Sequence, residues 1–141
     1  MAINRQAIFI SAGNFTPGRI AAANTASDGS GSLVTVVTAV TDGTRVDGVR
    51  FINSQTTAAA AAAKVFRVFL SDTGGTNYRI VGEVIAAAVT RSTTVAGQTA
   101  IYTFDQPIIM KSGQIMAVCQ SVYGSAADQT DAIAYAGDFT A

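Results

Sequence analysis

The sequence predicts an all-β protein built as a single eight-stranded antiparallel sandwich. Apolar residues recur with a period of two in short runs, and Gly, Asp, Ser, Thr and Asn separate these runs. No stretch shows a sustained helical period, an internal repeat or a proline-rich linker. The 141 residues therefore have the size and pattern of one domain. Within it, residues 1–32 should form an irregular N-terminal arm with the first strand, and residues 33–141 the main sandwich.

Eight segments carry the strand pattern. In chain order they are Gln6–Ser11, Ser32–Val40, Arg45–Asn53, Lys64–Ser71, Asn77–Ala86, Thr99–Phe104, Gln114–Val122 and Asp131–Ala136. Within Lys64–Ser71, bulky apolar residues occupy both alternating sets, with Phe66 and Val68 in one and Val65 and Phe69 in the other. This strand should be covered on both faces, one of them by the core and the other by a neighbour or partner.

Three short polar segments predict reversals of the chain. Asp42-Gly43 lies between two β-prone runs and predicts a two-residue hairpin, in which the flanking strands pair directly. The sequence SDTGGTN, residues 71–77, predicts a longer hairpin, and Gly113 in MKSGQI predicts a third reversal.

Two further segments lack a strand pattern. Ser11–Ser32 is a long irregular excursion in which Pro17-Gly18 and DGSGS indicate turns and flexibility. Ala58–Ala63 favours helix by propensity but is too short to hold one alone. A short helical turn or a small-residue loop would fit there, and we expect a plain connection in which the sequence matters little.

The charge balance restricts the class of partner. Nine basic and nine acidic residues cancel, charged residues make up 13% of the chain, and hydrophobic residues make up 49%. Without a basic patch, a nucleic-acid or anionic-membrane binder is not expected. An apolar, weakly charged surface favours association with another protein and self-association as a dimer or trimer. The apolar run Ala7–Ile10 is too short for a signal peptide or a membrane span, which favours a soluble protein made in a cytoplasm.

Asp72-Thr73-Gly74 is the sharpest catalytic candidate because aspartic proteases carry their carboxylate in this tripeptide. Those enzymes also need a distant hydrophobic-hydrophobic-Gly element that braces the loop. Here the nearby candidate, Ile80-Val81-Gly82, belongs to the very next strand. Residues 71–77 also contain what a hairpin needs by itself, so we interpret the tripeptide as a turn.

Other chemistry has weaker support. The chain has no histidine, which removes the Ser-His-Asp and Cys-His systems, and we interpret Cys119 as a small core residue. Asp72 with Glu83 stays open as a glycosidase pair, although solvated turn carboxylates are the plainer interpretation. Asp128–Asp131 could offer oxygen ligands to calcium or form a polar turn. We therefore expect no enzyme activity, no cofactor and no catalytic or metal site.

Several segments, taken in order, resemble a group of small structural proteins of tailed bacteriophages. They are DGTRVDGVRFINSQTT, an Ala-rich gap, VFRVFLSDTGGTNYRIVGEV, VTRSTTVAGQTA, PIIMKSGQIMAV and DAIAYAGDFTA, which together span about residues 40 to 141. Some members of this group are capsid cement (decoration) proteins with a jelly-roll fold. The resemblance assigns no capsid-contact residues to this chain.

The resemblance implies a virion protein on the outer surface of an icosahedral head, with the major capsid protein as partner. It also implies jelly-roll winding, in which most consecutive strands lie in opposite sheets, whereas the hairpin expected at Asp42-Gly43 would pair its flanking strands. We expect the segment Met1–Ser32 to act as an arm that reaches a neighbour. The alternative function is a tail or fibre module that binds a receptor or glycan, with Tyr78 and Tyr123 as the first candidate contact residues.

Overall fold

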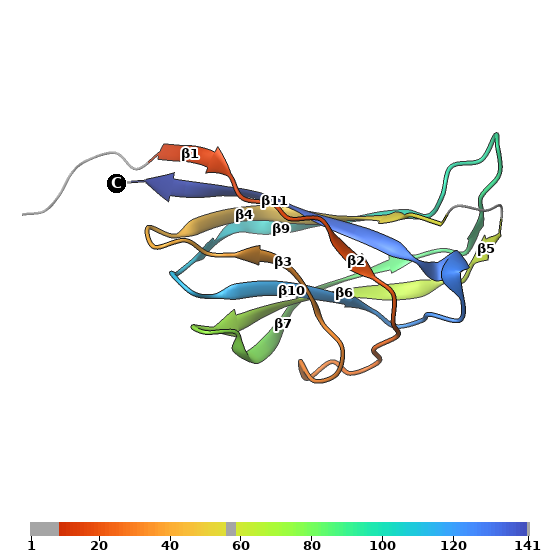
Figure 1. Ribbon diagram of the computed structural model, residues 1–141, viewed down its shortest axis with the longest axis horizontal. Coiled ribbons are helices and arrows are strands. Elements are labelled where there is room, and N and C mark those ends of the chain that lie inside the picture. Colours follow the sequence, from red (N-terminus) through yellow and green to blue (C-terminus); the bar gives the residue numbers. More distant parts are fainter. Residues whose placement is uncertain (1–8, 56–58, 141) are drawn as a thin grey trace, which may run out of the picture.

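A computed structural model describes residues 9–55 and 59–140, and it shows two β-sheets packed face to face (Figure 1). Sheet 1 contains β1 (Phe9–Gly13), β2 (Gly18–Ile20), β4 (Thr44–Asn53), β9 (Thr99–Met110) and β11 (Thr130–Thr140). Sheet 2 contains β3 (Val34–Thr38), β6 (Lys64–Asp72), β7 (Thr76–Ala86) and β10 (Ile115–Gln120). A ribbon of β5 (Ala60–Ala61) and β8 (Val89–Thr90) and a short 3₁₀ helix, η1 (Ala126–Asp128), lie at one end. The predicted all-β sandwich is confirmed.

Of the eleven strands in the described residues, nine occupy eight positions in the two main sheets, and the other two form the small ribbon. Sheet 1 has the order β1–β11–β4–β9, and sheet 2 has the order β3–β10–β6–β7. Both β1 and β2 pair with β11, β1 along residues 137–140 and β2 along residues 130–132, so they share one edge of sheet 1. The prediction of eight strands therefore matches the positions, while the split edge strand and the ribbon were not predicted. Residues 6–8 of the first expected strand lie outside the described residues.

The prediction of a hairpin at Asp42-Gly43 is wrong, because the two strands that flank this turn do not pair with each other. Gly43 does make a tight turn, with φ of 96° and its N–H donating to the Val40 carbonyl at 3.0 Å. However, β3 pairs with β10 while β4 pairs with β11 and β9, so the turn carries the chain from sheet 2 to sheet 1. Turn chemistry specifies a reversal of direction, but the burial of each strand's apolar face decides which strands pair. The segment around Gly113 also reverses between sheets, whereas residues 71–77 join the paired strands β6 and β7, as predicted.

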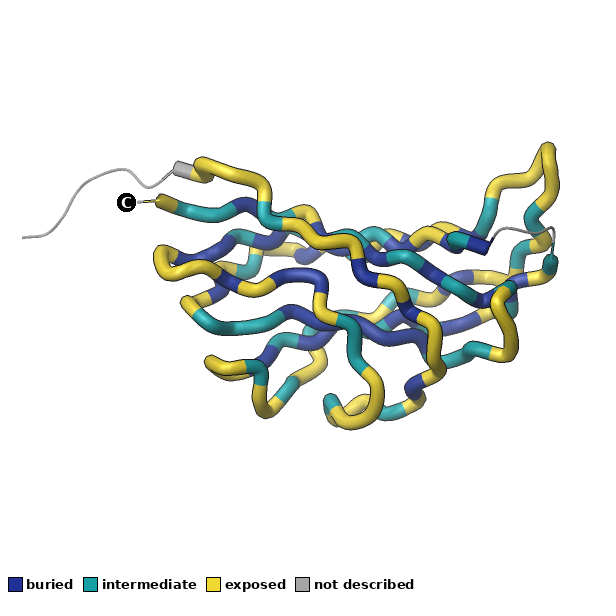
Figure 2. Tube along the Cα trace, in the orientation of Figure 1, coloured by how far each residue is buried: buried dark blue, intermediate teal, exposed yellow. Residues whose placement is uncertain are grey.

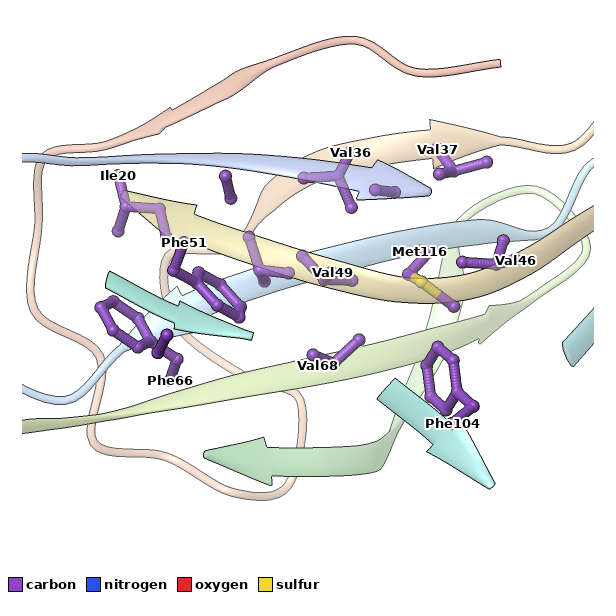
Figure 3. Close-up of a cluster of buried hydrophobic side chains, with 14 of the residues drawn as sticks. Ile20, Val36, Val37, Val46, Val49, Phe51, Phe66, Val68, Phe104 and Met116 are labelled. Carbon is purple, nitrogen blue, oxygen red and sulfur yellow. The ribbon is translucent and has the colours of Figure 1, made fainter. Parts of the chain in front are cut away.

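The core lies between the sheets and is filled by alternate residues of each strand (Figure 3). Phe51 of β4 and Phe66 of β6 stack across it, with ring centroids 4.3 Å apart and planes within 8°. Ile20 also belongs to this core and is 2% exposed, which corrects the expectation of a turn without a strand at Pro17-Gly18. Gly18 is the first residue of β2. A Cβ at this position would lie 2.5 Å from Val34 Cγ1, so glycine allows this edge strand to approach Val34.

The segment between β2 and β3, residues 21–33, lies on the outer face of sheet 2 and appears as the orange loop below that sheet in Figure 1. The Asn24 N–H donates to the Gln120 carbonyl at 2.8 Å, and Gly29 packs against Tyr78 at the other side of the sheet. The Asn24 amide also donates to the carbonyls of Ser30 and Ser32, which fastens the DGSGS turn. The described part of the N-terminal segment therefore folds onto its own chain, which corrects the expected flexible arm; residues 1–8 lie outside the described residues.

This loop explains why β6 is apolar on both sides. Phe66 and Val68 face the core, as predicted for one face of the strand. Phe69 and Cys119 point to the outer side of sheet 2, yet both are 0% exposed. Residues 21–33 cross the sheet from Cys119 to Tyr78, and they therefore cover the part of the outer face that carries Phe69 and Cys119. The neighbour expected for the second face of β6 is thus another part of this chain.

The alanine run also differs from the expected plain connection. Its described residues are not helical, and Ala60–Ala61 forms β5. Ala61 is 1% exposed, and the backbone of Ala62 donates to Asp128 and accepts from Gln98. A small side chain is therefore required at Ala61; Ala58 lies outside the described residues.

Candidate functional site

The two outer faces of the sandwich differ, and the difference identifies the candidate site. Residues 21–33 cover part of the outer face of sheet 2, as described above, and Ile80 and Ile85 of β7 remain exposed on that face. The outer face of sheet 1 carries a larger group of apolar side chains that solvent reaches, and we call this surface the open face. Its apolar residues are Ile10, Phe15, Ile52, Ile101, Ile109, Ile133 and Tyr135. Figure 2 shows the exposed positions along the strands of this sheet.

Strand register brings these side chains together from distant parts of the sequence. Ile133 of β11, Arg50 of β4 and Ile101 of β9 are direct neighbours in one row across the sheet. In the row beside it, Ile52 pairs with Asp131 on one side and Thr99 on the other. Because alternate residues point to opposite faces, all these side chains lie outside, opposite the core residues of the same strands.

The sequence of β11 shows how unusual this arrangement is. Its core-facing positions include the small residues Ala132 and Ala134, which are 0% and 1% exposed, whereas Ile133 and Tyr135 face outward. On β9, Ile101 and Ile109 are 51% and 58% exposed. A lone exposed isoleucine is ordinary, whereas a group of large apolar residues on one face is a pattern typical of interaction surfaces.

A shallow groove of about 380 Å³ runs along one side of the open face. Ile10 and Phe15 form one wall, and Ile133 and Tyr135 form the other. Two glycines permit this wall to form. The Phe15 ring lies 2.7 Å from the position that a Cβ on Gly13 would occupy, and Ile10 fills the position that a Cβ on Gly137 would occupy.

Ion pairs border the apolar area. Arg19 of β2 pairs with Asp131 of β11 at 2.9 Å, and Arg45 pairs with Asp47 of the same strand at 2.8 Å. The hydrogen bond from Arg19 lowers the pKa of Asp131. Exposed pairs of this kind contribute at most about 1 kcal/mol to stability. An apolar centre with a polar border is the arrangement found in protein–protein interfaces.

The candidate catalytic aspartate lies in an ordinary turn. Asp72 is exposed at the tip of the β6–β7 hairpin, where its carboxylate accepts from the Asn77 amide at 3.0 Å. Gly74 and Gly75 have φ of 88° and 74°, the left-handed values that the turn requires. Glu83 pairs with Arg67, five positions along β6 from Asp72, about 16 Å at the usual strand rise. The structure does not bring these carboxylates within the roughly 5–9.5 Å of a glycosidase pair.

The two carboxylates of the predicted calcium candidate, Asp128–Asp131, point to different places. Asp131 lies on the open face with Arg19, whereas Asp128 is buried at the end of the sandwich with Lys64. Among residues 9–55 and 59–140, no group of three or more acidic, cysteine or histidine side chains could hold a metal ion.

Sequence reasoning missed the buried pair of Lys64 and Asp128. Their side chains are 0% and 6% exposed, and Lys64 Nζ lies 2.8 Å from Asp128 Oδ1. Ala62 N–H donates to Oδ1 and Gly124 N–H to Oδ2, both at 2.9 Å. Burial by itself would raise the pKa of Asp128, but the hydrogen bonds from Lys64 and the two backbone N–H groups outweigh it and lower that pKa. This pair closes one end of the fold.

The remaining candidate residues from the sequence, two tyrosines and a cysteine, do not form a common site. Tyr78 lies in β7 near the β6–β7 hairpin, and Tyr123 follows β10 near η1, at the opposite end of sheet 2, so the structure does not bring them together. Cys119 is buried, as expected, but the prediction that it belongs to the core is wrong, because it lies beneath residues 21–33 rather than between the sheets. Burial raises the pKa of its thiol.

No protein family model matches this sequence, and no curated protein matches it significantly. No helix in the described part of the chain is long and apolar enough to cross a membrane.

Proposed function

We propose that this chain is a capsid cement (decoration) protein, which binds the outer surface of a tailed-phage head and stabilises contacts between major capsid subunits. Two observations support the proposal. The segments between residues 40 and 141 resemble phage structural proteins of this kind. The open face then supplies what such a protein needs, an apolar docking surface on a rigid sandwich. The open face is the observation that carries the proposal.

We also propose jelly-roll winding for the sandwich. Among the eight main positions, β6 and β7 are the consecutive strands that stay in one sheet, and the other connections change sheet. This alternation supports the winding used by many viral capsid domains. The wrong hairpin at Asp42-Gly43 removes the feature of the sequence that opposed it.

A cement protein would work by contact alone. Each copy binds two or more neighbouring capsid subunits, so that separating the subunits also requires breaking its contacts. Repeated copies on a symmetric shell add many such contacts, and self-association as a dimer or trimer would multiply them further. The protein would be made in the bacterial cytoplasm and act in the virion, with no reaction or cofactor.

The test compares heads of the encoding phage prepared with and without the protein. Labelled protein should decorate heads rather than tails in electron micrographs. Heads that carry it should survive heating and osmotic shock better than heads that lack it. Equal survival would contradict the stabilising role, and labelled tails would favour the alternative of a tail or fibre module.

A further inference from the structure

Arg50 lies near the middle of the open face, and its surroundings do not match its charge. It occupies the row between Ile133 on β11 and Ile101 on β9, so its direct neighbours across the sheet are both apolar. Its Nε is buried and has no hydrogen-bond partner among the described residues. None of the four ion pairs of the described residues includes Arg50. The Arg50 Nε–H therefore lacks the acceptor that a buried donor normally has.

The carboxylates closest to Arg50 in the register are already engaged. Asp131, one row away on β11, accepts from Arg19 Nε at 2.9 Å and from Arg19 Nη2 at 3.3 Å. Asp47, which precedes Gly48 on β4, accepts from Arg45 Nε at 3.0 Å and Nη2 at 2.8 Å. Arg19 and Arg45 are thus each paired with a carboxylate, whereas Arg50 is not paired with one in the described part of the chain.

We propose that the open face binds an apolar protein surface that presents a carboxylate to Arg50. The isoleucines around Arg50 would exclude water from the contact and strengthen the pair, because charge-assisted, bidentate bonds between arginine and carboxylate are the strong ones. The inference rests on the proposed function, under which that surface belongs to the major capsid protein. It adds the face that docks and the chemistry of the partner.

A second copy of the chain fits this face less well than an acidic partner. Two open faces packed on each other would bury their isoleucines and tyrosines well. A two-fold contact through the centre of the face would, however, place the Arg50 side chains of the two copies near each other, and like charges oppose such a contact. An acidic partner satisfies both the apolar area and the guanidinium.

The test measures binding of the purified protein to heads that lack it, by co-sedimentation over a range of protein concentrations. Arg50→Met keeps an apolar stem between the isoleucines and removes the charge, and Arg50→Glu reverses it. We expect the Kd to rise at least about tenfold for Arg50→Met and further for Arg50→Glu. Arg79→Glu, the same charge change at an exposed position of β7 in sheet 2, is the matched control and should leave the Kd within about twofold. Circular dichroism and thermal unfolding of each variant confirm that it folds.

The outcomes separate this inference from the proposed function. If the wild-type protein binds and the Arg50 variants bind equally well, the inference is wrong while the function stands. If the wild-type protein does not bind heads, the proposed function fails and the occupant named here fails with it. If the Arg50 variants lose self-association in sedimentation equilibrium but still bind heads, the face belongs to a second copy, which also overturns the inference. An electron microscopy map of decorated heads gives a check without variants: a capsid carboxylate should lie within hydrogen-bond distance of Arg50.

Discussion

Removing the Asp128 carboxylate should strongly destabilise the fold. This side chain accepts three hydrogen bonds: from Lys64 Nζ at 2.8 Å, and from the backbone N–H groups of Ala62 and Gly124 at 2.9 Å each. It thereby joins β5, β6 and the segment before η1 at one end of the sandwich. The perturbations are Asp128→Ala, which removes every acceptor of the side chain, and Asp128→Asn, which keeps one.

The magnitude follows from what each substitution leaves behind. Asp128→Ala leaves a buried lysine without its carboxylate, and breaking a buried pair in this way costs roughly 3–5 kcal/mol. We expect a loss of about 4 kcal/mol in the free energy of unfolding, or about 10–15 °C in Tm for a domain of this size. Asp128→Asn should lose about half as much of the free energy of unfolding. Its amide oxygen still accepts a hydrogen bond, but its NH₂ group replaces an acceptor and faces another donor.

Urea unfolding followed by circular dichroism measures the change, and the wild-type m-value must be preserved for the comparison to hold. Asp131→Ala is the matched control, because it removes a carboxylate three residues away whose partner Arg19 is 61% exposed. That substitution should cost at most about 1 kcal/mol. A loss below about 1 kcal/mol for Asp128→Ala would refute the claim that the buried pair holds this end of the fold.

The pH dependence gives a second test. Since the pKa of Asp128 is lowered in the folded state, its contribution to stability is present above the unfolded pKa of about 3.9 and is lost as the pH falls through the folded value. The difference in unfolding free energy between the wild type and Asp128→Asn should therefore be constant from neutral pH to about pH 5 and shrink below about pH 4. A difference that stays constant down to about pH 2 would contradict this mechanism.

Three further predictions concern other parts of the fold. Phe66→Ala removes half of the aromatic stack with Phe51 and should cost about 3–5 kcal/mol in urea unfolding, whereas Ile85→Ala, at a position 78% exposed, should stay within about 0.5 kcal/mol. Gly75→Ala should cost at least about 1 kcal/mol, because φ is 74° and the new Cβ would lie 2.7 Å from Ile115 Cδ1; an unchanged urea midpoint would show that the turn can relax. Cys119, buried and with a raised pKa, should react with a thiol reagent only after unfolding, and rapid labelling of the native protein would show that residues 21–33 open readily.

Much of the fold could be predicted from the sequence, because the period of two and the polar turns are local signals. The segments Arg45–Asn53, Lys64–Ser71 and Asn77–Ala86 correspond closely to β4, β6 and β7. The failures occurred where distant residues decide. The turn at Asp42-Gly43 looks the same locally whether its two strands pair or separate into different sheets.

The candidate site could be predicted much less well. The sequence showed that the surface is short of charge, and it showed apolar residues on both alternating sets of some strands. Residues 133 and 135 were within a predicted strand, and Ile109 lay beyond the predicted end of its strand at Phe104. Lys64 shares its alternating set with Phe66 and Val68, which could have signalled a buried amine in need of a carboxylate. Asp128, 64 residues away, could not have been identified as that partner.

The sequence by itself determined that this chain forms strands, where most of them lie, and that catalytic histidines are absent. Only the tertiary structure decided which side of each strand faces the core, because alternation defines two sets of side chains and does not say which is buried. In β11 the alanines went inward and Ile133 and Tyr135 outward, and the loop of residues 21–33 covered sheet 2 rather than sheet 1. Those two choices depend on contacts between residues far apart in the chain, and together they leave a group of large apolar side chains exposed on the outer face of sheet 1.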